Sequence, residues 1–380
     1  MKNRLSFIDQ KVTLDKELEA QQMTVHFGPQ HPSTHGVFRI DCTLDGEVVV
    51  DAKSHIGYLH RGIEKLVETR TYSQCMPFTD RLDYVAAMAN NICYAQAVEK
   101  LLDIQVPERV EYARVIVAEL QRIASHYLFI GTMGVDVGAL TLLWYGFDER
   151  EKYIDIFQKL SGARLTYNYM RIGGLSYDLY EGFAEEVRAA VDSIPRTIEE
   201  YHQLLAGNEI FLARTKGVGI LDPQKAFNYG CSGPWLRASG IPYDIRKVDP
   251  YGIYDRFDFK VCVRENGDIF DRWMIRLEEM EESRKIILQA LKDLPEGPYM
   301  AKVPRNPKPQ GEIYHRVETP RGELGMYIVG DGTVNPYRWH VRTPSFLNLS
   351  ILDKTVIGSM IADMVMTLAS IDIVLGESDK

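Results

Sequence analysis

Residues 107–126, PERVEYARVIVAELQRIASH, contain the clearest structural pattern in this chain. Val110, Val117, Leu120 and Ala124 recur at intervals of three, four or seven residues, which places them on one face of a helix. Proline suits the first position of a helix, because the N–H group that it lacks has no partner there. The sequence therefore predicts a helix from Pro107 to His126 with one face buried in a core.

Similar patterns predict further helices elsewhere. One has Thr79 as its N-cap, Asp80 and Asp83 in its first turn, and an apolar face that runs to Ile92. This prediction places Tyr84 on the first helical turn, after a break at Pro77. The other predicted helices span Ala139 to Leu160 with a stop near Gly162, Asp268 to Leu291, and Thr355 to Ala369.

Strands are predicted on both sides of this helical region. Phe38, Ile40, Cys42 and Leu44 alternate with polar residues, and Asp45-Gly46 can form the turn of a hairpin that continues through residues 47–50. Residues 312–317 and 325–329 are also strand-like. The fold class that we expect is α+β, with a central helical bundle flanked by small antiparallel sheets.

We expect five parts along the chain. They are a polar N-terminal arm at 1–22, a β region at 23–62, a mainly helical core at 63–302, a Pro-rich linker at 303–311, and C-terminal strands with a helix at 312–380. We find no internal repeat and no low-complexity tract in the sequence.

Composition excludes several classes of protein. The chain has 380 residues, 45% of them hydrophobic and 26% charged, which is typical of a globular protein. A formal net charge of −9 without a polybasic stretch argues against a nucleic-acid partner. The longest apolar run, 356–375, is interrupted by Asp363 and Asp372, and the N-terminus lacks an apolar signal core. We therefore expect any membrane association to depend on partner subunits.

The spacing of the cysteines and the lack of familiar catalytic motifs exclude further kinds of site. The five cysteines are scattered and form no C-x-x-C pair, which favours a reducing compartment and excludes the usual clustered iron–sulfur motifs. The chain also lacks a G-x-G-x-x-G, a Walker A motif, H-E-x-x-H and G-x-S-x-G. We therefore expect it to bind neither NADH nor a nucleoside triphosphate through a recognised loop.

Four of the nine histidines lie in two loop-like phrases, GPQHPSTHG at 28–36 and HIGYLHRGIEK at 55–65. These are His31, His35, His55 and His60. A histidine can donate, accept, carry charge or bind a metal near neutral pH, so chemistry is expected first in these phrases. Gly36 directly follows His35 and would allow a ligand to approach closely.

Each of these residues also has a purely structural interpretation. A zinc site at His31 and His35 is disfavoured, because Pro32 separates them and the phrase contains no carboxylate. Both imidazoles could instead hold the loop in place; the two interpretations are balanced for His31, and function is favoured for His35.

The remaining candidates have similar alternatives. For Tyr84, a place in the core is the default, and for Arg61 and Arg81 a place on the surface. Asp136 lies in an apolar stretch, and a buried carboxylate requires a cationic or hydrogen-bonding partner, for which a histidine is suitable.

Several long phrases together resemble the 49-kDa family of respiratory complex I, which comprises the D subunits of the NADH:quinone oxidoreductases. The resemblance extends from about Met23 to the C-terminus. The phrases that carry it are GPQHPSTHG, HIGYLHRGIEK, TYSQCMPFTDRLDY, ELQRIASH, SGARLTYNYMRIGG, SGPWLRASGIPYDIRK, RGELGMYIVGDG and SFLNLSILD.

This resemblance implies a fold like the large subunit of nickel–iron hydrogenases. A hydrogenase itself is excluded, because such a subunit holds its metals with two C-x-x-C pairs and this chain has none. The resemblance therefore implies no metal site in this chain and a cavity that takes quinone as substrate.

The family's site residues can be carried over position by position. The resemblance implies that His35 and Tyr84 contact the quinone headgroup and that Asp136 pairs with His35, with His31, Gly36, His55 and His60 in the loops of the site. It places Arg61 and Arg81 near a [4Fe–4S] cluster that the neighbouring small subunit ligates. Many relatives have a histidine where this chain has Thr166, and threonine cannot titrate there.

The resemblance also implies a setting. The chain would be a subunit of a proton-translocating NADH:quinone oxidoreductase, active only in the complex. Its partners would be the cluster-bearing small B subunit and subunits C, H and I, with the membrane arm contacted indirectly. It would lie peripherally on the cytoplasmic face of the cell membrane. The alternative is a structural paralogue that retains the assembly surfaces without quinone turnover.

Overall fold

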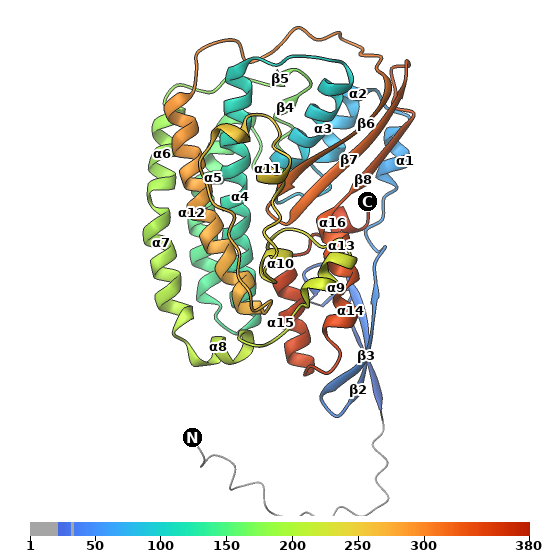
Figure 1. Ribbon diagram of the computed structural model, residues 1–380, viewed down its shortest axis with the longest axis vertical. Helices are drawn as coiled ribbons and strands as arrows, with labels where there is room; N and C mark the ends of the chain where they lie inside the picture. The colour runs from blue at the N-terminus through green and yellow to red at the C-terminus, as the bar shows by residue number, and fades with distance from the viewer. Residues whose placement is uncertain (1–21, 32–33) are drawn as a thin grey trace, which may run out of the picture.

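The computed structural model describes residues 22–31 and 34–380. The arm predicted at 1–22 lies outside these residues, except for Gln22. Long helices run side by side along the molecule, with one three-stranded sheet at each end of their right-hand side (Figure 1). This arrangement is α+β, as the sequence predicts.

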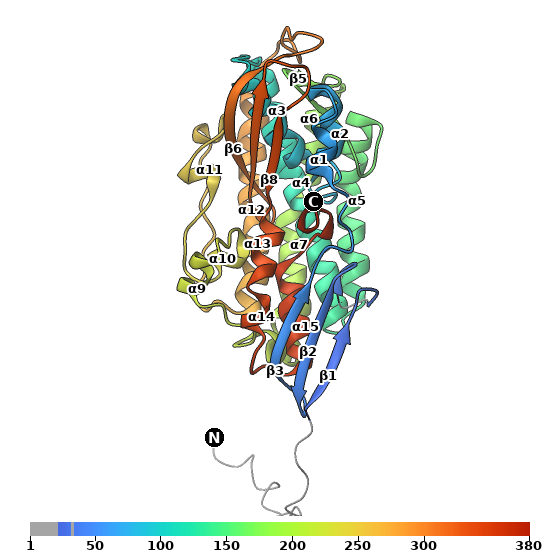
Figure 2. The same cartoon turned by 90° about the vertical axis from the view of Figure 1, so that its right-hand side faces the viewer.

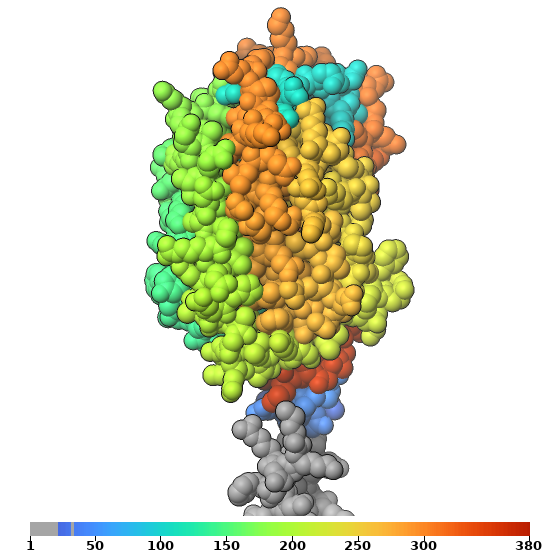
Figure 3. All heavy atoms as spheres, turned by 60° about the vertical axis from the view of Figure 1, so that its left-hand side comes forward, coloured from blue at the N-terminus to red at the C-terminus, as the bar shows by residue number. Residues whose placement is uncertain are grey.

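Helix α4 (Glu108–Asp136) is the central helix of the bundle and is buried over most of its length. It contacts α3 (Ala87–Leu101), α5 (Thr141–Ser161) and α12 (Ile269–Asp293). On the outer face, α12 lies between the green α6–α7 region and the yellow segment before it (Figure 3). The core of the protein therefore surrounds α4.

The predicted helix at 107–126 is confirmed, with two differences. Pro107 is the N-cap residue and the helix begins at Glu108. The helix also continues beyond His126 to Asp136, because Tyr127, Ile130 and Met133 maintain the buried face. This extension places Asp136 at the end of the central helix.

Two other helix predictions are confirmed by α5 and α12. Helix α5 ends at Ser161, and Gly162 follows in the left-handed conformation with φ 79°. Helix α12 begins after Asp268, whose side chain accepts a hydrogen bond from the backbone N–H of Asp271.

The helix predicted from Thr79 is wrong at its start. Thr79 is the last residue of α2 (Tyr72–Thr79), Pro77 lies inside that helix, and the next helix begins only at Ala87. Residues 80–86 form a turn, in which Asp83 Oδ1 accepts from the backbone N–H groups of Val85 and Ala86. Tyr84 therefore lies in a turn and not on a helix.

The N-terminal sheet has the order β1-β2-β3, with β1 (Met23–Phe27), β2 (Arg39–Asp45) and β3 (Val48–His55) antiparallel. Its β2–β3 hairpin is the predicted one, and Phe38, Ile40, Cys42 and Leu44 are buried. The connection between β1 and β2 contains the GPQHPSTHG phrase, and Figure 2 shows this sheet below the C-terminal sheet.

The C-terminal sheet has the order β6-β7-β8. Strands β6 (Gln310–Thr319) and β7 (Gly322–Asp331) include both predicted strands and extend beyond them. Strand β8 (Arg338–Arg342) was not predicted. The linker predicted at 303–311 contains no helix or strand up to residue 309, but residues 310–311 belong to β6.

The last predicted helix begins later than expected. Helix α15 spans Ile361–Ile371, whereas residues 352–355 belong to the short helix α14 (Leu352–Thr355).

No helix among the described residues is long and apolar enough to cross a bilayer. The other helices and strands are α1 (Ile63–Val67), β4 (Met170–Arg171), β5 (Gly174–Leu175), α6 (Phe183–Asp192), α7 (Ile194–Tyr201), η2 (His202–Ala206), α8 (Glu209–Thr215), α9 (Pro223–Asn228), α10 (Pro234–Arg237), α11 (Ile245–Val248), η3 (Tyr254–Arg256), α13 (Pro344–Ser350) and α16 (Leu375–Ser378).

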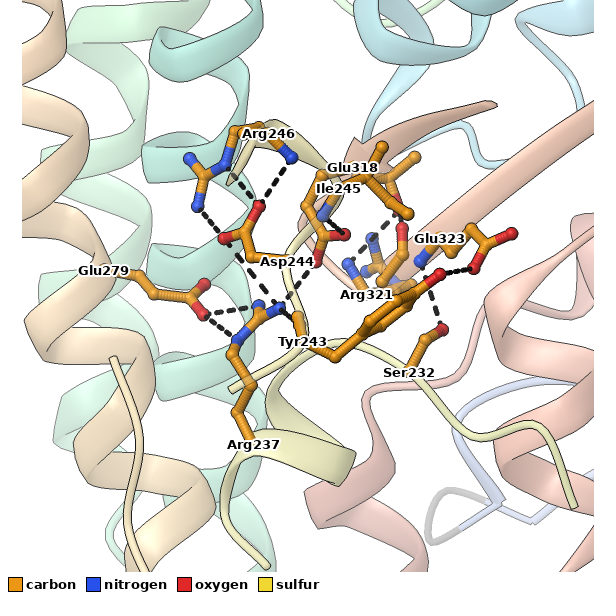
Figure 4. Close-up of polar contacts among 12 residues, drawn as sticks. Ser232, Arg237, Tyr243, Asp244, Ile245, Arg246, Glu279, Glu318, Arg321 and Glu323 are labelled. Atoms are coloured by element: carbon orange, nitrogen blue, oxygen red, sulfur yellow. Dashed lines mark hydrogen bonds and ion pairs between the residues drawn. The ribbon is translucent and has the colours of Figure 1, made fainter. Parts of the chain in front are cut away.

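A buried network of charged residues connects these layers (Figure 4). The guanidinium of Arg237 donates to Glu279 on α12 at 2.6 Å and to Glu318 on β6 at 2.7 Å. Glu119 on α4 accepts from Arg246 of α11 at 3.1 Å. In these contacts each buried charge has an opposite partner. The network therefore fixes how α4 and α12 of the bundle, strand β6 and the segment with α10 and α11 pack together.

Candidate functional site

A cavity of about 350 Å³ lies where the β1–β2 connection, the turn at 80–86, the end of α4 and the C-terminal segment meet. Its lining combines aliphatic side chains with several polar ones. The lining residues are His35, Tyr84, Val85, Leu128, Thr132, Val135, Asp136, Leu143, Arg321, Asp372, Ile373 and Val374. Three of the predicted site residues, His35, Tyr84 and Asp136, are thus brought together from distant parts of the sequence.

His35 and Asp136 form a direct pair. His35 Nε2 lies 2.8 Å from Asp136 Oδ2, and the two side chains are 16% and 10% exposed. The partner that a carboxylate in this apolar stretch requires is therefore His35. With Nε2 donating to the carboxylate, Nδ1 is left for another contact.

The loop before β2 determines the position of His35. Thr34 is buried, and its hydroxyl donates to the carbonyl oxygens of His31 at 2.7 Å and Gly36 at 2.9 Å. His35 itself adopts the left-handed conformation with φ 53°, which is uncommon outside glycine. Gly36 has φ 142°, and a Cβ there would lie 2.8 Å from Leu375 Cδ1. The loop can therefore direct His35 towards α4.

His31 lies at the other end of the same loop. Its ring packs edge-on against Phe27, with 5.6 Å between centroids, and its backbone bridges to Gly36. His31 and Gly36 shape the loop but are not among the residues that line the cavity.

Tyr84 contributes the other ring to the cavity wall and is 37% exposed. Burial, followed by the negative charge of Asp83, raises the pKa of Tyr84. Its hydroxyl therefore keeps its proton at neutral pH and can donate a hydrogen bond into the cavity.

Two charged residues of the cavity lining were not predicted from the sequence. Arg321 lies in the turn between β6 and β7, and Asp372 follows α15 in the left-handed conformation with φ 63°. Their side chains pair, with Arg321 Nη2 3.2 Å from Asp372 Oδ1. The available signals were the RGELG phrase and the acidic residue that interrupts the apolar run at 356–375.

His55 and His60 lie away from the cavity lining. His55 Nε2 is 3.0 Å from Asp41 Oδ2, at the end of β3. His60 Nδ1 is 3.0 Å from the carbonyl oxygen of Asp379, whose carboxylate also accepts from the backbone N–H groups of Gly57 and Leu59. Both contacts fix the HIGYLHRGIEK phrase to neighbouring structure.

Arg61 and Arg81 lie side by side at the surface. Arg61 Nη2 donates to the carbonyl oxygen of Arg81 at 2.7 Å, and Arg81 is 45% exposed. The buried carboxyl of Asp80 lies 3.5 Å from Arg81 Nη1. Burial raises the pKa of Asp80 to about 6, although its hydrogen bond with Asn91 opposes this change.

The described residues contain no group of three or more His, Cys, Asp or Glu side chains placed to hold a metal ion. The site therefore consists of hydrogen-bonding and ionisable side chains around a partly apolar cavity. This chain is thus an α+β protein with a cavity whose polar lining includes an imidazole, a phenol, carboxyl groups and a guanidinium.

Comparison with known proteins shows the family to which this chain belongs. The family described as "Respiratory-chain NADH dehydrogenase, 49 Kd subunit" matches residues 136–308 and 304–380. A protein of Clostridium beijerinckii, named as the D subunit of NADH-quinone oxidoreductase, is 54% identical over 96% of this chain and 99% of its own length. Proteins of the same name from Desulforamulus reducens and Carboxydothermus hydrogenoformans are 54% and 52% identical, each over 95% of this chain and 99% and 100% of their own lengths. This chain belongs to the 49-kDa subunit family of the respiratory-chain NADH dehydrogenase.

Proposed function

We propose that this chain is the quinone-site subunit of an NADH-quinone oxidoreductase of the proton-translocating type, the translocase class. The observation that carries the proposal is the convergence of His35, Tyr84 and Asp136 on one cavity. The relatives' name supports quinone as the substrate. The chain's role is to bind the headgroup and to supply protons to it.

The cavity matches the chemistry of a quinone headgroup. Such a ring is flat and largely apolar, and the aliphatic side chains of Val85, Leu128 and Leu143 line the cavity. Each ring carbonyl gains a proton when the quinone is reduced to the quinol, so two donors are required. Tyr84 donates through its hydroxyl and His35 through a ring nitrogen.

The His35–Asp136 pair determines which form of the imidazole can donate. When Nε2 donates to Asp136, a neutral ring has only an acceptor at Nδ1. His35 can therefore donate to the quinone only as an imidazolium, and the nearby carboxylate stabilises that positive charge. Asp136 thus orients the ring through the hydrogen bond at Nε2.

Transfer of the His35 proton to the substrate would leave Asp136 without its counter-charge. An uncompensated, largely buried carboxylate is destabilising and favours rearrangement of its surroundings. We propose this event as the origin of the coupling to proton translocation in the membrane partners.

The Arg61–Arg81 surface is the proposed contact with the small B subunit, where a [4Fe–4S] cluster would supply the electrons. Two guanidinium groups at one surface suit a position near the cluster, because their positive charge would stabilise an electron added to the cluster. Thr166 cannot take up a proton in that region, so any redox-linked protonation requires another group.

We propose that the fold is like that of the large subunit of nickel–iron hydrogenases. We also propose that the chain lies peripherally on the cytoplasmic face of the cell membrane. Subunits C, H and I are the further proposed partners, and through them the membrane arm. No helix among the described residues could span the bilayer, which supports attachment through other subunits.

Tyr84→Phe in the assembled complex tests the function. It removes one hydroxyl, and a hydrogen bond lost in a buried site costs about 1–3 kcal/mol, which corresponds to about tenfold in rate per 1.4 kcal/mol. Quinone reduction should slow about tenfold, whereas reduction of an artificial acceptor upstream of the site should be unchanged. Tyr337→Phe is the control, because Tyr337 is 68% exposed and lies outside the cavity lining.

Equal loss of both activities would make Tyr84 a structural residue and refute the assignment. A wild-type complex that assembles and oxidises NADH but reduces no quinone would instead support the structural paralogue.

A further inference from the structure

Three acidic side chains gather around Arg321, which lines the cavity together with one of them, Asp372. Arg321 Nη1 lies 2.8 Å from Asp83 Oδ2, and Arg321 Nη2 lies 3.2 Å from Asp372 Oδ1. The Nε of Arg321 donates to the carbonyl oxygen of Asp372 at 2.7 Å, and Nη1 also lies 3.2 Å from Ser125 Oγ. Four of the five N–H groups of the guanidinium thus face Asp83, Asp372 and Ser125. The third acid is Glu377.

Glu377 lies on α16 and is 0% exposed. One carboxyl oxygen, Oε1, accepts from the backbone N–H of Ser345 at 3.1 Å. The other, Oε2, is buried and has no hydrogen-bond partner among the described residues. A carboxylate in this position would carry its charge with one of its two oxygens unsatisfied.

The backbone around Glu377 packs closely on the segment that contains Tyr84. A Cβ on the neighbouring Gly376 would lie 2.5 Å from the carbonyl oxygen of Leu82 and 2.8 Å from that of Arg81. Helix α16 and the turn at 80–86 are therefore in direct contact. Glu377 directly follows Gly376 and therefore lies next to the turn that contains Tyr84.

The charges around Glu377 do not balance an ionised carboxylate. Asp83 faces it from the turn, and Arg321, shared with Asp372, faces it from the β6–β7 connection. Lys380 is the other nearby cation, but its ammonium group donates to the carbonyl oxygen of Val341. Burial, followed by the charge of Asp83, raises the pKa of Glu377 to about 8, with the Ser345 hydrogen bonds and Arg321 opposing.

We propose that Glu377 is a buried carboxylic acid that stores the proton with which Tyr84 is recharged after each quinone reduction. This proposal rests on the proposed function of the cavity. Glu377 does not line the cavity, so it acts through Tyr84 and is a positioning and proton-storing residue. Asp83 and Arg321 influence both Tyr84 and Glu377 electrostatically.

The proton balance of the step is simple. The Tyr84 O–H bond breaks and its proton passes to a quinone oxygen, while the two electrons come from the upstream donor. Tyrosinate is a much stronger base than a carboxylate, so the proton of Glu377 moves to the Tyr84 oxygen. Glu377 is then a carboxylate until it takes a proton from solvent, which returns the site to its initial state.

The first test concerns the protonation of Glu377 and does not require activity. Infrared difference spectra of the resting complex between about pH 7 and pH 9 should show the loss of a carboxylic-acid band, because the pKa of Glu377 is about 8. Glu377→Gln should lack this change. A wild-type spectrum without such a band, or with the same band in Glu377→Gln, would overturn the proposal.

Thermal unfolding of the complex near neutral pH adds a matched comparison. Glu377→Gln replaces one neutral group with another of the same shape, so the midpoint should be unchanged. Asp83→Asn makes the same chemical change at an acid that pairs with Arg321, so the midpoint should fall. An equal fall in both variants, or failure of Glu377→Gln to assemble, would show that Glu377 is ionised and would refute the storage role.

The third test is kinetic. Glu377→Gln should slow quinone reduction about tenfold, because solvent protons must replace the store. The loss should grow as the pH rises to about 8 and then level off, because Glu377 of the wild type itself loses its proton above its pKa. Glu377→Asp, which retains an acid, should recover most of the rate. An unchanged rate and pH profile in Glu377→Gln would overturn the proposal even if the infrared band is present. Failure of the proposed function would differ, because the wild-type complex itself would then reduce no quinone.

Discussion

The His35–Asp136 pair allows a quantitative test of the chemistry at the cavity. Asp136→Asn keeps the size of the side chain but removes its charge, and His35→Ala removes the imidazole. The two atoms of the pair are 2.8 Å apart and both side chains are largely buried, so their interaction is a charge-assisted hydrogen bond shielded from solvent. The two single variants and the double variant form a thermodynamic cycle.

The expected size of the coupling follows from this geometry. Hydrogen bonds to charged groups contribute about 1.5–3 kcal/mol, which corresponds to roughly 10- to 150-fold in rate. Asp136→Asn should therefore slow quinone reduction by that factor. His35→Ala should cost about 100-fold or more, because a general acid is lost. The double variant should be hardly slower than His35→Ala, since Asp136 acts only through the imidazole.

The assay is steady-state quinone reduction by the assembled complex, with reduction of an upstream artificial acceptor measured on the same samples. Asp155→Asn is the matched control, because that carboxylate is 57% exposed on α5 and pairs with Arg164. It should leave both activities unchanged.

Full additivity of the two single losses would refute the reasoning. In that case Asp136 and His35 would affect the reaction independently, and the contact between them would be structural. A loss in the artificial-acceptor assay of the same size would show damage to assembly instead.

Two further predictions concern the buried network. Burial alone would raise the pKa of Glu119, but the charges of Arg122 and Arg246 lower it to about 2. Arg246 also pairs with Asp244, so Glu119→Gln should leave buried Arg122 without its carboxylate partner and reduce the free energy of unfolding by about 3–5 kcal/mol in thermal or denaturant unfolding. Burial lowers the pKa of His126 to about 4 despite its bond to Glu279. Between about pH 6.5 and pH 4 the unfolded chain therefore binds a proton that the folded chain does not, and stability should fall by about 3 kcal/mol as the pH drops. His126→Gln should lose less stability over this interval, and an identical pH dependence in both proteins would contradict the prediction.

The long helices could be predicted from the sequence because their periodic apolar residues all face one core. The turn at 80–86 could not, because its acids resemble the first turn of a helix. In the structure Asp83 pairs with Arg321, and Asp80 Oδ1 accepts from the side chain of Asn91. Arg321 lies 238 residues after Asp83, and Asn91 lies 11 residues after Asp80, on the next helix, so the spacing of residues within one helix contains no information about these partners. Strand β8 was missed for a similar reason, since it is short and is defined by its pairing with β7.

For the site, the residue types and the family could be read from the chain alone, because the histidine phrases and the RGELG phrase are local features. Which of these side chains share a cavity depends on the tertiary fold. It brings His35 to Asp136 and adds Arg321 and Asp372, whereas it fixes His60 to Asp379 away from the lining. A cavity forms where separate elements pack, so its lining requires the end of α4, a left-handed loop residue and the C-terminal segment to meet in space.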